Sequence, residues 1–258
     1  MPDLRISVRL SALRLPLKKA LLAASRLGAR GVEIDARTEM QPADLTDTAT
    51  RQIRKMMDDL NLRVSSVRFQ TRRGYDVLAD LDRRIEATKA AMRMAFALGA
   101  PHVVNQIGRV PSDTESPRWE QLRTVMEDLG RYGAHIGAFL AAETGTESGE
   151  DLARLIQGLE NAYVSAALNP GQLVVNDFSV ADAVRALGAD IGVVVAQDGV
   201  QDLARGRGID VPLGQGSADY PQILGALEDF RYRGWFVVGR PGGGEAEAAE
   251  AVEYLTNL

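Results

Sequence analysis

Short apolar runs alternate along the chain with longer amphipathic stretches. Runs of aliphatic and β-branched residues, such as IGVVVAQD at 191–198, are typical of strands that are buried on both faces of a parallel sheet. Between the runs, apolar residues recur at helical spacing, as Ile53, Met57 and Leu60 do. The predicted strands are residues 5–10, 31–37, 62–69, 102–107, 138–144, 163–169, 191–198 and 235–240. The predicted helices are residues 17–27, 46–61, 80–100, 116–137, 149–159, 180–187, 220–230 and 245–258.

This order repeats a strand followed by a helix eight times. Strict alternation at this count favours an α/β fold, a single (β/α)8 TIM barrel, and an open doubly wound sheet is the alternative. The length of 258 residues agrees with the size of such barrels, which is typically about 250 residues. A glycine-rich loop is predicted over residues 199–217. No proline- or serine-rich linker divides the chain, so one domain over residues 1–258 is expected.

Composition narrows the classes of function. A hydrophobic content of 45% and a charged content of 25% are ordinary for a soluble globular protein. The net charge of −5 argues against a nucleic-acid partner, because a phosphate-binding surface is normally basic. The lack of cysteine excludes disulfides, thiolate nucleophiles and cysteine-ligated metals. The sequence shows neither a signal peptide nor an apolar run that could span a membrane, so a cytoplasmic protein is expected.

Two predicted strands end one after the other in polar residues, Glu143 and Asn169. In a parallel α/β barrel the carboxyl ends of the strands face the active-site mouth, which makes Glu143 the candidate catalytic residue. Burial without a metal would raise the pKa of Glu143 and make it a general base. The alternative is a carboxylate that is paired with a neighbouring arginine and has no catalytic role.

Arginines gather at two other strand exits. Arg68, Arg72 and Arg73 follow the third strand, and the guanidinium fork matches phosphate or carboxylate groups. Arg240 precedes a Pro-Gly-Gly-Gly run at the start of the last helix, where barrels often bind phosphate. These four arginines are predicted to contact substrate. For Arg68, Arg72 and Arg73 the alternative is a solvated loop or internal salt bridges. For Arg240 and the glycine run it is a flexible connector.

Neutral amides also lie at predicted strand ends. Asn105, Asn169 and Gln197 are the candidates for contact with sugar hydroxyls, which need both donors and acceptors. The two histidines, His102 and His135, are expected to be structural, because neither is placed at the upper end of a strand. The predicted mouth is therefore polar and nearly uncharged at its centre, with arginines around it.

Four segments together resemble one known family. They are GVEIDAR at 31–37, the strand, Glu-Thr-Gly turn and helix of 138–159, NPGQL at 169–173, and VPLGQGSADYPQILGALEDFRYRGWFVV at 211–238. In this order they resemble the xylose-isomerase-like TIM-barrel family of sugar and sugar-phosphate isomerases and epimerases. The resemblance implies an isomerase of carbohydrate metabolism with a sugar or sugar phosphate as substrate, and often a homo-oligomer. A non-catalytic barrel that binds a carbohydrate or related metabolite is the alternative.

The resemblance also implies a divalent metal such as manganese, magnesium or zinc, held by Glu, Asp, His and Glu at four strand ends. In this chain those positions fall on Glu143, Asn169, Val195 and Gly239. Only one of the four keeps its ligand, and neither valine nor glycine offers a side-chain donor. A largely dismantled metal site without a bound metal or other cofactor is therefore expected.

A displaced metal site is the remaining possibility. Glu33 and Asp35 are two residues apart, so they point to the same face of their strand. With Glu143 and Asp198 they would offer an all-oxygen site for magnesium or manganese. A metal displaced onto Glu33, Asp35 and Asp198 would suit a lyase or hydrolase. Pairing of these carboxylates with Arg5, Arg9 or Arg68 is the commoner outcome.

Overall fold

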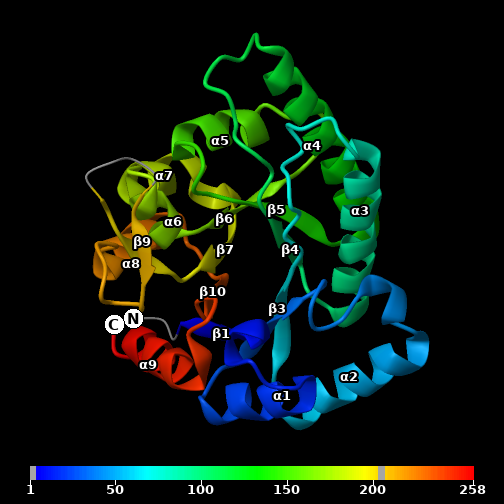
Figure 1. The fold of residues 1–258 in the computed structure, drawn as a ribbon, viewed down its shortest axis with the longest axis vertical. Helices are drawn as coiled ribbons and strands as arrows, with labels where there is room; N and C mark the ends of the chain where they lie inside the picture. Colours follow the sequence, from blue (N-terminus) through cyan, green and yellow to red (C-terminus); the bar gives the residue numbers. More distant parts are fainter. Residues whose placement is uncertain (1–3, 203–206) are drawn as a thin grey trace.

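The computed structural model describes residues 4–202 and 207–258. Eight parallel strands close into a barrel in the order β1-β10-β7-β6-β5-β4-β3-β2, with helices around it (Figure 1). The predicted (β/α)8 barrel is thus confirmed. The barrel strands are β1 (Arg5–Arg9), β2 (Gly31–Asp35), β3 (Arg63–Arg68), β4 (His102–Asn105), β5 (Phe139–Glu143), β6 (Ser165–Leu168), β7 (Ile191–Val195) and β10 (Trp235–Val238).

Nine α-helices are present in these ranges. They are α1 (Leu17–Arg26), α2 (Asp47–Asp59), α3 (Leu81–Leu98), α4 (Pro117–Ile136), α5 (Gly149–Gln157), α6 (Pro170–Val175), α7 (Val180–Leu187), α8 (Tyr220–Asp229) and α9 (Gly244–Thr256). Short 3-10 turns occur at Leu10–Leu13, Pro42–Asp44 and Gly188–Asp190. Hydroxyl side chains start several helices: Ser116, Ser148 and Ser179 each accept a backbone N–H from the first turn. Figure 1 shows α3 and α4 packed beside one another on the outside of the barrel.

One helix and one small sheet were not predicted from the sequence. No helix was predicted directly after β6, but that segment forms α6, because the Asn169 side chain accepts the Gln172 N–H and Pro170 occupies the first helical position. The glycine-rich segment contains a small antiparallel sheet of β8 (Asp198–Val200) and β9 (Ile209–Val211). Part of the loop predicted there, residues 203–206, lies outside the described residues.

The barrel interior has an apolar side and a polar side. The apolar side comes from β4 to β7 and β10, and consists of Val104, Ala141, Ala167, Val193, Val195, Trp235 and Val237. The polar side comes from β1 to β3, where the buried Arg9 Nε lies 2.6 Å from Glu33 Oε1. Ser66 donates to the other Glu33 oxygen at 2.9 Å, and the hydroxyls of Ser7 and Ser65 are 2.6 Å apart. A much larger apolar core fills the layer between strands and helices.

No helix in the described part of the chain is long and apolar enough to cross a membrane.

Candidate functional site

Glu143, at the end of β5, is the centre of a hydrogen-bonded cluster at the upper end of the barrel. Arg68 at the end of β3 donates to Glu143 Oε2 at 3.0 Å, and Gln70 Nε2 donates to the same oxygen at 2.5 Å. Asn169 Nδ2, just after β6, donates to Glu143 Oε1 at 2.9 Å. Both carboxylate oxygens are therefore held by donors from the ends of β3 and β6, which lie on either side of β5 in the barrel. The structure therefore brings together three of the predicted site residues, Arg68, Glu143 and Asn169, and their roles stay predictions.

The ionisation of Glu143 differs from what the sequence suggested. Burial opposes the charged form, but the positive charges of Arg68 and Arg9 and the Asn169 hydrogen bond outweigh burial and hold the pKa of Glu143 below its ordinary value. Of the two readings that the sequence left open, the raised pKa is wrong, and the pairing of Glu143 with a neighbouring arginine agrees with the structure. An ionised carboxylate with a lowered pKa is a good hydrogen-bond acceptor and a weak base.

Amide side chains extend the cluster toward β7. Asn169 Nδ2 also donates to Gln197 Oε1 at 2.8 Å, while Asn169 Oδ1 accepts the Gln172 N–H that starts α6. The backbone carbonyl of Gln197 accepts the Tyr220 hydroxyl at 2.8 Å. These contacts define which way the Asn169 amide points. The side chains of Asn169 and Gln197 are thus pre-oriented at the mouth, where the sequence placed them.

A cavity of about 140 Å³ opens above this cluster. It is smaller than the roughly 300–1,000 Å³ of pockets that hold drug-sized ligands, so it suits a small molecule. Hydroxyl and amide groups predominate in its lining, with one internal ion pair. The lining residues are Arg68, Gln70, Gln106, Glu143, Thr144, Gly145, Thr146, Asn169, Gln172, Gln197, Asp210 and Pro241.

Gln70 is a member of the site that the sequence reasoning passed over. It lies two residues after Arg68, and in an extended segment such residues point to the same side. Both side chains reach Glu143. The alternation from Arg68 to Gln70 was the signal that would have found it.

A divalent metal of the kind implied by the family resemblance does not fit this donor set. Val195 is fully buried in the apolar side of the barrel, and Asn169 offers its amide nitrogen, not oxygen, to Glu143. Gly239 has a φ of 116°, and a Cβ there would come within 3.0 Å of the Ala12 Cβ. Glu143 is the single anion among the four positions, and its oxygens are already engaged.

The three carboxylates considered for a displaced metal site are each engaged separately. Glu33 pairs with Arg9. Asp35 accepts the backbone N–H groups of Arg37 and Thr38 in its own loop. Asp198 accepts four backbone N–H groups around the β8–β9 segment. Within residues 4–202 and 207–258, no group of three His, Cys, Asp or Glu side chains is placed to hold a metal ion.

Other residues predicted to contact substrate lie outside the mouth. Asn105 is fully buried on the far side of β4, where its oxygen accepts the Thr71 N–H at 3.0 Å and its nitrogen donates to the Tyr75 hydroxyl at 2.9 Å. These bonds make it a structural amide that holds the loop after β3. Arg240 makes a two-pronged ion pair with Glu247 in the first turn of α9, at 2.9 and 2.7 Å. The Arg240 guanidinium, which was expected to contact substrate, is therefore paired with Glu247.

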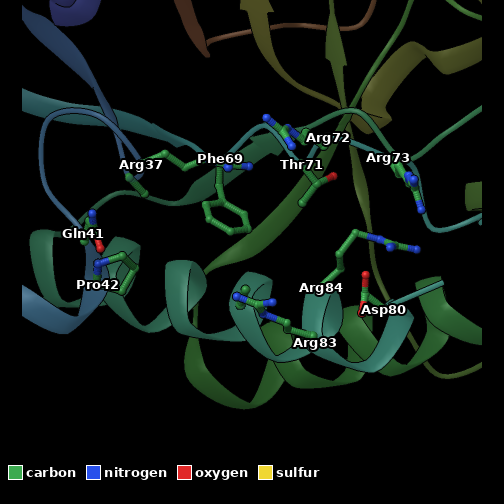
Figure 2. Close-up of a pocket in the computed structure, with 12 residues that line it drawn as sticks. Arg37, Gln41, Pro42, Phe69, Thr71, Arg72, Arg73, Asp80, Arg83 and Arg84 are labelled. Carbon is green, nitrogen blue, oxygen red and sulfur yellow. The ribbon is translucent and has the colours of Figure 1, made fainter.

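Arg72 and Arg73 are also separated from Arg68. They line a different cavity, outside the barrel wall and against α3 (Figure 2). The histidines lie where the sequence placed them. His102, at the start of β4, is largely buried, and burial lowers its pKa to about 4, so it is neutral near pH 7. His135 is exposed near the end of α4.

Glu147, shortly after β5, is a buried carboxyl group outside the mouth. It is 3% exposed, accepts the Thr146 hydroxyl, and lines a second cavity of about 560 Å³. Burial raises the pKa of Glu147 from 4.5 to about 7, and its hydrogen bonds only partly offset this. The native state therefore favours the protonated form. The contribution of Glu147 to the free energy of unfolding is fully present below about pH 4.5 and is lost as the pH rises through 7.

We expect Glu147→Gln to stabilise the protein by about 1–3 kcal/mol at pH 8.5 and to have little effect at pH 4.5, because the amide cannot ionise. The measurement is urea unfolding at both pH values. The same exchange at exposed Glu253 is the control and should shift stability by less than about 0.5 kcal/mol. An effect of Glu147→Gln that is equal at the two pH values would contradict the assignment.

Comparison with known proteins identifies the family. A model described as a xylose isomerase-like TIM barrel matches residues 21–258. The chain belongs to this family. A xylose isomerase domain protein from Planctomyces limnophilus is 22% identical, with a TM-score of 0.87 over 99% of this chain and 96% of that chain. No curated protein sequence matches this chain.

Two more distant structures share the barrel. The probable 3-DHS dehydratase AsbF from Bacillus anthracis is 14% identical, with a TM-score of 0.81 over 98% of this chain and 99% of that one. A D-allulose 3-epimerase from Methylomonas sp., solved in complex with D-allulose, is 16% identical, with a TM-score of 0.75 over 99% and 97%. At these identities the likeness establishes the fold. The structures that share this fold thus include a D-allulose 3-epimerase and a probable dehydratase.

Proposed function

We propose that the mouth of this xylose isomerase-like barrel binds a small polyhydroxylated metabolite of monosaccharide size, without a resident metal. The observation that carries the proposal is the Glu143 cluster, a buried carboxylate held by Arg68, Gln70 and Asn169 under a small polar cavity. Arg68 offsets the charge of Glu143, and Asp210 accepts a hydrogen bond from Gln172 Nε2. The amides and hydroxyls of the lining offer both donors and acceptors. Such a surface suits sugar hydroxyls better than a charged or apolar ligand.

The family relationship supports the same class of ligand. One protein of this fold was solved with the monosaccharide D-allulose. In the present chain, Glu143 has three donor side chains for about four lone-pair sites, and Gln197 Oε1 has one donor for two, so each could accept one further hydrogen bond from a sugar hydroxyl. Gln106 and Thr146 would provide further polar contacts from the cavity wall. Since the lowered pKa keeps Glu143 ionised, its hydrogen bonds to hydroxyl groups would be charge-assisted.

The test is calorimetric titration of the metal-free protein with D-allulose, D-tagatose, D-fructose and D-xylose. We expect one of these sugars to bind at a single site, and Glu143→Gln to weaken binding by roughly tenfold to a hundredfold, as expected for loss of a charged hydrogen-bond partner. Exposed Gln52 on α2 provides a control, and Gln52→Ala should bind like the wild type. Binding that is unchanged in Glu143→Gln would contradict the proposal.

Metal-independent isomerisation or epimerisation is the second candidate. It is favoured by one observation, the Arg68 guanidinium beside the only family carboxylate that this chain retains. Glu143 would remove the proton next to the sugar carbonyl, and Arg68 would stabilise the resulting enediolate. Turnover in heavy water with a chelator present would introduce deuterium at that carbon, and Glu143→Gln would abolish the exchange. Sugar binding without deuterium exchange would contradict isomerisation and epimerisation, and would support the binding function only.

A further inference from the structure

Five arginines surround a cavity of about 550 Å³ that is separate from the mouth (Figure 2). Arg72 and Arg73 come from the loop after β3, Arg83 and Arg84 from the first turn of α3, and Arg37 from the loop after β2. One carboxylate, Asp80, is the only acidic side chain in the lining. The whole chain is acidic, with a net charge of −5, so this concentration of positive charge runs against the overall balance.

The cavity and the mouth share one segment of chain but none of their lining residues. Arg68 and Gln70 point inward to Glu143, whereas Phe69 and Thr71 point outward to the arginine cavity. This alternation follows from the extended backbone, which sends successive side chains to opposite sides. The arginine cavity is therefore a second potential binding site, and it lies in the helix layer.

The guanidinium groups are not neutralised by the protein. Arg72, Arg73 and Arg83 are exposed at the rim of the cavity, and they make no hydrogen bond or ion pair with the described residues. Arg37 Nη1 donates to the Gln70 carbonyl at 2.8 Å, which holds its position. Arg84 donates to the carbonyls of Ala79 and Val77, and its buried Nε has no partner among the described residues.

This cluster of guanidinium groups is electrostatically unfavourable without a bound anion. Like charges that face one cavity repel each other, and a buried N–H without an acceptor is costly. An anion between the loop and α3 would relieve both, since the guanidinium fork binds phosphate oxygens in pairs. Figure 2 shows Arg72 and Arg73 on one side of the space and Arg83 and Arg84 on the other, so a ligand with two anionic groups would be contacted from both sides.

We propose that this cavity binds a phosphorylated small molecule with at least two negative charges, held by Arg72 and Arg73 on one side and Arg83 and Arg84 on the other. Its volume falls within the range of small-molecule pockets, about 300–1,000 Å³. The aromatic ring of Phe69 and the nearby Pro42 provide an apolar wall for the uncharged part of the ligand.

Inorganic pyrophosphate is the probe for this proposal, titrated into the full chain in low-salt buffer by calorimetry, with orthophosphate as a comparison. We expect one saturable site that binds pyrophosphate at least tenfold more tightly than orthophosphate. The double variant Arg72→Gln, Arg83→Gln should weaken pyrophosphate binding at least tenfold. Both side chains are exposed, so we expect the variant to fold with an unchanged melting temperature.

The matched control removes two exposed arginines elsewhere, as Arg26→Gln, Arg231→Gln, and should bind within twofold of the wild type. Glu143→Gln should also bind pyrophosphate normally, which separates this site from the mouth. The proposal is overturned by the absence of saturable binding or by an equal loss in the control. A twelve-nucleotide single-stranded DNA that outcompetes pyrophosphate at this site would overturn it too, because it would point to a nucleic-acid surface.

Discussion

Arg68→Met is expected to destabilise the protein by about 3–5 kcal/mol near neutral pH, because it leaves Glu143 buried without its cation. Glu143 is 8% exposed and Arg68 Nη2 lies 3.0 Å from it. The amides of Gln70 and Asn169 still donate to the carboxylate, but they carry no charge to offset burial. The measurement is urea unfolding of wild type and variant at pH 5 and pH 8.

The pH dependence has a defined sign. In the wild type the pKa of Glu143 is lowered, so its contribution to stability is present above the pKa of the unfolded chain and is lost as the pH falls through the folded value. In Arg68→Met, desolvation is no longer opposed by the nearest cation, and the pKa of Glu143 should rise. The variant should therefore be more damaged at pH 8 than at pH 5.

Two controls separate pairing from packing. The double variant Arg68→Met, Glu143→Met should recover much of the lost stability, since neither charge is then left alone in the interior. Arg123→Met breaks ion pairs with Glu120 and Glu127 on the surface of α4, and should cost less than about 1 kcal/mol. If Arg68→Met costs no more than Arg123→Met, the Glu143 cluster is not the buried charge pair described above.

Asp198→Ala is expected to cost about 3–5 kcal/mol, by a different mechanism. Asp198 is 1% exposed, and its carboxylate accepts the backbone N–H groups of Gly199, Gly214, Gly216 and Ala218 at 2.8–3.1 Å. Alanine would leave these donors without an acceptor, at about 1–3 kcal/mol for each one that water cannot reach. The loop before α8 should lose its order along with stability.

Urea unfolding and limited proteolysis would measure the two consequences of Asp198→Ala. New cleavage is expected between residues 211 and 218, and Asp198→Asn should be milder because it retains one acceptor oxygen. Asp58→Ala removes a carboxylate from an exposed pair with Arg63 and should stay within about 0.5 kcal/mol of the wild type. Wild-type stability and proteolytic resistance in Asp198→Ala would show that the loop is held by other contacts.

The contacts of Asp198 also explain why sequence position alone could not decide whether a displaced metal site exists. It follows β7 and is buried, as a metal ligand at a strand end would be. Its oxygens, however, are used to organise backbone N–H groups from a loop as far as 20 residues away. A carboxylate with four such donors is already satisfied. Asp198 therefore supports the rim of the mouth instead of contacting its contents.

The barrel itself was predictable, because its signals are local. Runs such as IGVVV in β7 are apolar on both faces, and each is followed by a helical pattern of apolar residues, which together leave few folds other than a closed parallel barrel. The helix α6 and the β8–β9 pair were missed, because both are short. Their formation depends on the Asn169 cap and on pairing within a glycine-rich segment.

The sequence also predicted which strand-end residues lie at the same end of the barrel. Because parallel strands in a barrel end at one face, Arg68, Glu143, Asn169 and Gln197 could be placed at one mouth before their distances were known. Their roles in binding or catalysis stay predictions. The sequence determined this neighbourhood, since it depends only on the order and direction of the elements.

Partners and ionisation were decided by the tertiary structure alone. Arg68 and Glu143 are 75 residues apart, and nothing local indicated that this arginine, and not Arg72 or Arg73, would face the carboxylate and lower its pKa. Likewise, Arg240 is ion-paired with Glu247, and Asn105 is hydrogen-bonded to Thr71 and Tyr75. A long side chain can reach several neighbours, and the choice among them depends on loop paths and burial, which are set only when the whole barrel closes.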